Sequence, residues 1–201
     1  FLGISTTLDA GQLARDMIKH SAVLYLEGYL FDQPLAKQAF RDAALLAKSN
    51  GRKVALTLSD GFCVDRHRAE FLDLIRSGVD ILFANENEIK SLYETTSFDD
   101  AAAKVRKDAK LAVLTRSAKG SVIFDGASVT TVAADPVEQV VDTTGAGDLY
   151  AAGFLYGHAR GLSHETSGKL ASMAAGEVIS HIGARPAVPL AELARKKGLL
   201  A

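Results

Sequence analysis

The sequence predicts an α/β protein in which a mostly parallel central sheet is covered by helices on both faces. Short apolar runs alternate with amphipathic helical patterns along most of the 201 residues, as in chains built from strand–helix units. The runs are apolar at successive positions, which is typical of strands buried on both faces. Hydrophobic residues make up 48% of the chain and charged residues 23%, which is enough apolar material for one sizeable core.

The first part of the chain predicts two helices, each followed by a strand. Asp9 is a candidate N-cap for an amphipathic helix that extends to about residue 20, and the apolar run at 22–26 follows it as a buried strand. Pro34 opens the second helix and Gly51 ends it, in agreement with the preference for proline at the start and glycine beyond the end. A second strand is expected at 53–58.

The middle of the chain repeats the same unit. A helix over 65–76 leads into a strand at 81–84. Helical segments at 86–93 and 99–107 then precede a strand at 111–115. Alternating strands and helices in this order favour parallel strand pairing.

A β-hairpin and a helical region complete the pattern. Residues 121–124 and 129–132 are separated by Asp125-Gly126, which is a typical hairpin turn. The remaining helices are expected to open at Gly147, to run over 163–181 and to follow Pro189. No internal repeat or long linker interrupts the chain, so we expect one domain over residues 1–201.

Composition and charge exclude several classes of function. The 23 basic and 24 acidic residues are spread without blocks, so neither nucleic acid nor an anionic membrane is an expected partner. The longest apolar stretches are far too short to span a bilayer, and no signal peptide is recognisable. Cys63 is the only cysteine, which excludes an intrachain disulfide and fits a cytoplasmic protein.

The cysteine and the histidines show no pattern typical of a metal site. We therefore interpret Cys63 as a small packing residue. The five histidines are interpreted as surface or packing residues: His20, His67, His158, His164 and His181.

The segment from Asp142 to Asp148, D-T-T-G-A-G-D, carries the strongest functional signal. It lies between the apolar pair Val140-Val141 and a helical stretch, so a glycine-rich turn opens a helix. The first N–H groups of a helix and its positive dipole end suit an anion such as a transferred phosphate. A carboxylate at the mouth of the turn, Asp148, can accept the proton of an attacking hydroxyl. The alternative is that both aspartates only cap turns and the glycines only turn a corner.

In this strand–turn–helix context the segment resembles the D-T-x-G-A-G-D signature of the PfkB family of ribokinase-like carbohydrate kinases. The resemblance implies a three-layer α/β/α kinase that uses ATP and Mg²⁺. It also implies that Asp148 deprotonates the acceptor hydroxyl. The backbone N–H groups of Gly145, Ala146 and Gly147 would then bind the γ-phosphate.

Asn85 and Glu88 follow the strand at 81–84 and resemble the N-x-x-E motif of this family. The resemblance implies that they lie near the nucleotide and that Glu88 helps to organise the Mg²⁺ shell indirectly, since Mg²⁺ commonly keeps several waters. The alternative is an N-cap followed by an acidic residue that the helix dipole favours.

The segment from Thr115 to Gly120 resembles the T-x-G-x-x-G nucleotide loop of the family. Ser117 replaces the first glycine, and we expect the loop to form if Ser117 has an ordinary negative φ. Arg116 or Lys119 could then contact phosphate. The alternative is a polar loop between two strands.

Small residues near the end resemble the adenine side of the family's nucleotide site, with Ala175 on a helix and Gly183 in the turn after it. The alternative is close helix packing, which is the commoner use of small residues. In several relatives, backbone oxygens near the positions of Asp142, Thr144 and Gly183 hold a monovalent cation. The resemblance therefore implies a K⁺ site in this region, with Asp142 as its metal-site residue.

The acceptor is expected to be a small sugar or nucleoside. Residues 25–29, 57–62 and 82–86 are most similar to the adenosine-kinase-like branch, which makes adenosine the expected acceptor and ribose- or fructose-type sugars the alternative. Glu27-Gly28-Tyr29 and Ser59-Asp60 each follow a strand and could line the acceptor pocket or only form turns.

The chain matches only the later two-thirds of a typical family member. It has no initiator Met, and Phe1 to Ser5 reads as the interior of a strand, so we expect a fragment without the N-terminal strands and lid. Because such lids often build dimers, a homodimer is a further expectation. The alternative function is a nucleotide-binding module that positions no acceptor and does not turn over. A Rossmann dehydrogenase is disfavoured because no G-x-G-x-x-G follows the first strands.

Overall fold

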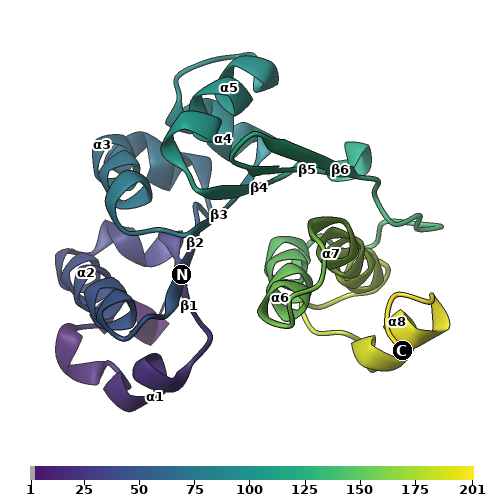
Figure 1. The fold of residues 1–201 in the computed structure, drawn as a ribbon, viewed down its shortest axis with the longest axis horizontal. Coiled ribbons are helices and arrows are strands. Elements are labelled where there is room, and N and C mark those ends of the chain that lie inside the picture. The colour runs from purple at the N-terminus through teal and green to yellow at the C-terminus, as the bar shows by residue number, and fades with distance from the viewer. Residues whose placement is uncertain (1–2) are drawn as a thin grey trace. The chain divides into compact units, whose positions relative to one another are not determined.

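The structure, a computed structural model that describes residues 3–201, has one six-stranded sheet with the strand order β1-β2-β3-β4-β5-β6 (Figure 1). β1 pairs in parallel with β2, and β2 with β3. The α/β class, with a mostly parallel sheet and a terminal hairpin, is therefore confirmed. The strands are Val23–Glu27 (β1), Lys53–Thr57 (β2), Ile81–Asn85 (β3), Leu111–Thr115 (β4), Ser121–Asp125 (β5) and Ser128–Val132 (β6).

The α-helices follow the predicted order. They are Arg15–His20 (α1), Pro34–Ser49 (α2), Gly61–Ser77 (α3), Glu86–Leu92 (α4), Phe98–Asp108 (α5), Ala146–Ala159 (α6), His164–Val178 (α7) and Leu190–Lys196 (α8). In the described residues 3–201, none of these helices has the length and apolar character that crossing a membrane requires.

The internal contacts group the chain into two compact units. The first runs to Leu114 and includes Phe124–Ser128, and the second comprises Thr115–Ile123 and Val129–Ala201. The expectation of a single domain over residues 1–201 stays a prediction.

The first unit is built on the parallel strands. α2 packs against β1 and β2, and α4 packs against β3 and α5. Its core includes three aromatic rings: Phe31 stacks on Phe71 at 4.6 Å between centroids and lies 5.8 Å from Phe40. All three rings are buried. This aromatic cluster belongs to the apolar core of the first unit.

The second unit is built on the helix pair α6 and α7, which pack along one another. The approach is close because Gly153 and Gly157 of α6 leave no room for a side chain. A Cβ atom on Gly153 would lie 2.7 Å from the Cα of Ala171, and one on Gly157 would lie 2.5 Å from the Oγ of Ser167. Small residues on this helix pair therefore serve packing.

Three predicted boundaries are wrong in detail. The helix expected from Asp9 is divided into a 3₁₀ turn at Ala10–Gln12, which Asp9 caps, and α1. α3 begins at Gly61 rather than 65 because the Asp60 carboxylate accepts the N–H groups of Phe62 and Cys63. α7 ends at Val178, three residues earlier than expected.

Two predicted strands are absent from the described residues. Val140 and Val141 lie in an irregular segment, although the Val141 N–H donates to the Ile179 carbonyl at 2.8 Å. Gly3–Thr7 forms a 3₁₀ helix, so the strand expected at the start is wrong there, while Phe1 and Leu2 lie outside the described residues.

Candidate active site

The Asp142 side chain organises the glycine-rich turn of the second unit. Its Oδ1 accepts hydrogen bonds from the Thr144 hydroxyl at 2.6 Å and the Thr144 N–H at 2.9 Å. Its Oδ2 accepts the Gly183 N–H at 3.0 Å. The Thr144 hydroxyl, the Gly183 N–H and the Thr144 N–H together lower the pKa of Asp142 to about 2. Asp142 is therefore ionised at neutral pH and ties two segments 41 residues apart.

Gly145 is the residue at which the chain turns into α6. It is the N-cap of this helix, with a φ of 81° in the left-handed region that glycine tolerates best. A Cβ atom on Gly145 would lie 2.9 Å from the Cβ of Ala184. Both the backbone angle and the contact therefore require glycine at this position.

The first turn of α6 contains the other predicted phosphate ligands. The Ala146 N–H already donates to the Thr143 carbonyl at 3.2 Å. Gly147 has no non-local heavy atom within 4 Å of the place where its Cβ would be, so the backbone at this position is open. Asp148 is exposed in the same turn. An open helix start next to a carboxylate can bind an anion and accept a proton.

The loop from Thr115 to Gly120 is compact but differs from the expectation in one respect. Ser117 has a φ of 51°, so the ordinary negative φ expected for it is wrong. The turn is closed by the Arg116 N–H, which donates to the Gly120 carbonyl at 2.7 Å. Gly120 is buried, whereas Lys119 is exposed, and Thr115 and Arg116 are half-buried. The serine adopts a left-handed backbone at the position where the family motif has glycine.

Asn85 and Glu88 form a reciprocal capping box at the start of α4. The Asn85 side chain accepts the N–H groups of Asn87 and Glu88, and the Glu88 carboxylate accepts the Asn85 N–H at 2.9 Å. Glu88 is 6% exposed, and burial raises its pKa to about 7, with further contributions from the charges of Asp60 and Glu27. The N-cap alternative is thus confirmed, and the carboxylate also lies in a region of excess negative charge.

The carboxyl ends of β1, β2 and β3 bring three carboxylates near one another. Glu27 accepts a hydrogen bond from the Ser59 hydroxyl. Ser59 has a φ of 64°, and Asp60 caps α3. Glu27 and Asp60 both raise the pKa of Glu88. From the sequence, these residues could be placed only at or after the ends of strands. Each of the three neighbouring strands has an acidic residue at or shortly after its carboxyl end, and this pattern could have predicted that the three carboxylates lie close together.

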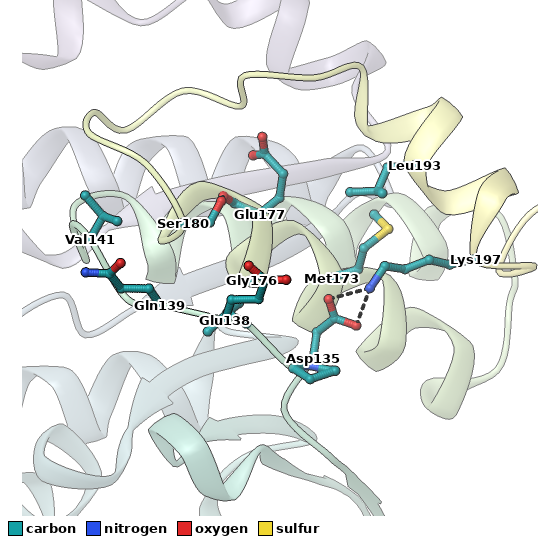
Figure 2. Close-up of a pocket in the computed structure, with 12 residues that line it drawn as sticks. Asp135, Glu138, Gln139, Val141, Met173, Gly176, Glu177, Ser180, Leu193 and Lys197 are labelled. Atoms are coloured by element: carbon teal, nitrogen blue, oxygen red, sulfur yellow. Dashed lines mark hydrogen bonds and ion pairs between the residues drawn. The ribbon is translucent and has the colours of Figure 1, made fainter.

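A pocket of about 440 Å³ lies in the second unit beside the segment that leads into the glycine-rich turn (Figure 2). Its wall on α7 includes Met173, Gly176 and Glu177. In Figure 2, Lys197 faces Asp135, and its ammonium group lies 2.7 Å and 2.8 Å from the two carboxylate oxygens.

The residues predicted on the adenine side lie on α7 and in the loop after it, and neither of them lines this pocket. Ala175 is half-buried on α7, directly before Gly176, which lines the pocket. Gly183 lies in the loop after α7 and contacts Asp142. The structure thus brings Asp142, Thr144, Gly145 and Gly183 together in the second unit, while Asn85 and Glu88 belong to the first unit.

The region around Cys63 contains a side-chain cluster that the sequence analysis did not expect. One ligand-type atom from each of Asp32, Cys63 and His67 lies within 4.8 Å of the others. The His67 Nε2 lies 2.8 Å from Asp32, and Arg66 binds the same carboxylate with two N–H groups at 2.7 Å and 3.0 Å. The Lys37 ammonium lies 3.1 Å from the other ring nitrogen of His67. Because these charges are already paired, we interpret the cluster as a hydrogen-bonded network.

The profile of a protein family described as pfkB family carbohydrate kinase matches residues 5–191 of this chain. The crystal structure of adenosine kinase from Sinorhizobium meliloti is 53% identical, with a TM-score of 0.93, and the match covers 96% of this chain and 59% of that chain. The 5-dehydro-2-deoxygluconokinase of Listeria monocytogenes serotype 4b is 28% identical over 187 residues, which are 90% of this chain and 58% of that protein.

A structure from E. coli assigned as a ribokinase II, in complex with ATP and Mg²⁺, has a TM-score of 0.85 at 18% identity and supports the fold. This match covers 96% of the present chain and 63% of the E. coli chain. The chain thus spans less than two thirds of the length of these relatives.

Proposed function

Since this chain belongs to the pfkB family of carbohydrate kinases, we propose that the protein transfers the γ-phosphate of ATP to a hydroxyl group of a nucleoside or sugar. The observation that carries the proposal is the turn from Asp142 to Asp148. A left-handed glycine opens α6, the first helical turn leaves backbone N–H groups for an anion, and an exposed carboxylate lies in the same turn.

In this proposal Asp148 is the catalytic base, and the first turn of α6 stabilises the transferred phosphoryl group. Gly147 offers the most open backbone, whereas the Ala146 N–H would have to exchange its bond to Thr143 for a phosphate oxygen. Gly145 shapes the turn. Thr115, Arg116, Lys119 and Gly120 form the loop proposed for the nucleotide. The pocket that Gly176 lines is proposed for its base, with Ala175 and Gly183 as base-side residues.

The carboxylates of the first unit fit a divalent cation. Burial and the charges of Asp60 and Glu27 raise the pKa of Glu88 to about 7, and a cation bound nearby would stabilise its ionised form. Glu88 and Asn85 would hold the Mg²⁺ shell through water, and the ion would neutralise charge on the phosphates when bound. The Asp142 region is proposed for K⁺, which the backbone oxygens near Thr144 and Gly183 would bind.

We propose a nucleoside, and specifically adenosine, as the acceptor. The adenosine kinase of Sinorhizobium meliloti is 53% identical over nearly the whole of this chain, whereas the Listeria 5-dehydro-2-deoxygluconokinase is 28% identical. Glu27, Ser59 and Asp60 are the proposed acceptor-side residues, because they lie at the carboxyl ends of β1 and β2, and β2 is the neighbour of β3, which precedes Glu88.

The second candidate function is a module that binds the nucleotide without turnover. Positioning of the acceptor can account for several kcal/mol of barrier lowering, so a protein that does not hold the acceptor against Asp148 would bind ATP and turn over poorly.

The experiment is ATP consumption with Mg²⁺ over adenosine, cytidine, ribose, fructose and 5-dehydro-2-deoxygluconate. The 201-residue chain and a protein of the relatives' full length are compared. Adenosine-dependent turnover in the longer protein is the expected result. Turnover only with a sugar would refute adenosine as the acceptor. If both proteins bind ATP and neither turns over, the result would favour the nucleotide-binding module.

A further inference from the structure

Glu177, at the end of α7, binds the loop that follows this helix. Its side chain is 8% exposed. The Oε1 atom accepts the Ala187 N–H at 2.9 Å and lies 3.3 Å from the Nε2 atom of His181. One carboxylate therefore contacts both ends of residues 181–187, called here the 181–187 loop.

The 181–187 loop also packs against the glycine-rich turn. The Gly183 N–H donates to the Asp142 carboxylate at 3.0 Å. Ala184 is the residue that a Cβ atom on Gly145 would meet at 2.9 Å. Displacement of the loop would therefore remove one hydrogen bond from Asp142 and one packing partner from Gly145.

The second carboxylate oxygen of Glu177 is a separate observation that indicates a functional role for this side chain. Within residues 3–201, the Oε2 atom is buried and has no hydrogen-bond partner. An unpaired buried carboxylate oxygen costs free energy, which an apolar side chain of the same length would avoid. In Figure 2 the carboxylate points away from Asp135, so the ion pair at the other side of the pocket does not use it.

We propose that Glu177 is a positioning residue that holds the 181–187 loop against the glycine-rich turn and thereby sets the affinity of this turn for nucleotide phosphates. The proposal rests on the proposed function for the identity of the ligand. It does not require Glu177 to touch the nucleotide. The residue acts through the Ala187 N–H, and through Gly183 and Ala184, on Asp142 and Gly145.

The test compares Glu177→Met, which has no acceptor for the Ala187 N–H, with Glu177→Gln, which keeps one. Glu165→Met is the matched control, because Glu165 is exposed on the same helix. Amide hydrogen exchange in the 181–187 loop and ATP affinity are measured for the full-length protein. Glu177→Met is expected to raise exchange at Ala187 and Gly183 and to weaken ATP binding, each about tenfold. Glu177→Gln and Glu165→Met are expected to stay within about threefold of the wild type.

Two results would overturn the proposal. The first is unchanged exchange at Ala187 and Gly183 in Glu177→Met, and the second is faster exchange without any loss of ATP affinity. A wild-type protein that phosphorylates no acceptor would refute the proposed function instead. The exchange comparison remains decisive for the loop in that case, since it needs no turnover.

Discussion

Glu88 combines deep burial, a capping role and two neighbouring negative charges. Its folded pKa of about 7 lies above the ordinary value of 4.5, so the folded state holds a proton that the unfolded state has released between these pH values. The free energy of unfolding of the wild type should therefore fall as the pH rises from 4.5 to 7, by up to about 3 kcal/mol from this group alone.

Urea unfolding at several pH values, in a buffer with a chelator, measures this dependence. Glu88→Gln cannot ionise, so its stability should not show this part of the decline. Glu86→Gln, in the same helical turn, is the control and should follow the wild type. A wild type and a Glu88→Gln variant with parallel pH profiles would contradict the raised pKa.

At the scale of single elements, the start of α6 contains two glycines with different expected roles. Gly145 is needed for the stability of the turn, and Gly147 is proposed to leave space for phosphate. Gly145→Ala places a side chain at a φ of 81° and 2.9 Å from Ala184, so we expect a loss of at least about 2 kcal/mol of stability. Gly147→Ala meets nothing within 4 Å, so stability should stay within about 1 kcal/mol of the wild type.

ATP titration of the same two variants tests the phosphate site. Gly147→Ala should weaken ATP binding although the fold is intact, because its methyl group enters the space proposed for phosphate. A Gly147→Ala protein with wild-type ATP affinity would argue against phosphate at this position, and thermal melts of both variants give the stability comparison.

Asp80 joins elements at the other ends of the strands. This carboxylate is 6% exposed and accepts the Val54 N–H at 2.9 Å, Lys48 at 2.7 Å and Lys110 at 3.0 Å. These hydrogen bonds lower its pKa against the opposing effect of burial. Asp80→Asn should therefore cost about 2 kcal/mol of unfolding free energy in urea. Lys110→Met, at an exposed partner, should cost less than about 1 kcal/mol, and equal losses in both variants would contradict this account.

Most elements could be predicted because their limits are set by local chemistry. Pro34 opens α2, Ser163 caps α7, and Gly126 turns the hairpin between β5 and β6. The errors arose where a side-chain cap acted over one turn, as Asp60 does for α3. The prediction of a negative φ for Ser117 was wrong for a related reason. The closed hydrogen-bonded turn imposes a φ of 51° on Ser117, and a serine usually avoids this value.

At the scale of the whole molecule, the sequence indicated the pieces of the candidate site but not the contacts between them. The hydrogen bond from Gly183 to Asp142 joins residues 41 positions apart, and the Ala187 contact of Glu177 depends on the path of a loop. No local spacing contains that information. The grouping of Glu27, Asp60 and Glu88 likewise follows from strand order in the sheet, and the family of the chain was recognisable from one heptapeptide.

The measurement that tests the central claim most directly compares Asp148→Asn with the wild type in the full-length protein. ATP affinity should stay within about threefold, and acceptor-dependent ADP formation should fall at least about 100-fold, because the hydroxyl loses its base. Asp99→Asn, at the corresponding turn of α5, is the control and should keep full turnover. Wild-type turnover in Asp148→Asn would contradict the assignment of Asp148 as the base, and with it the proposed mechanism.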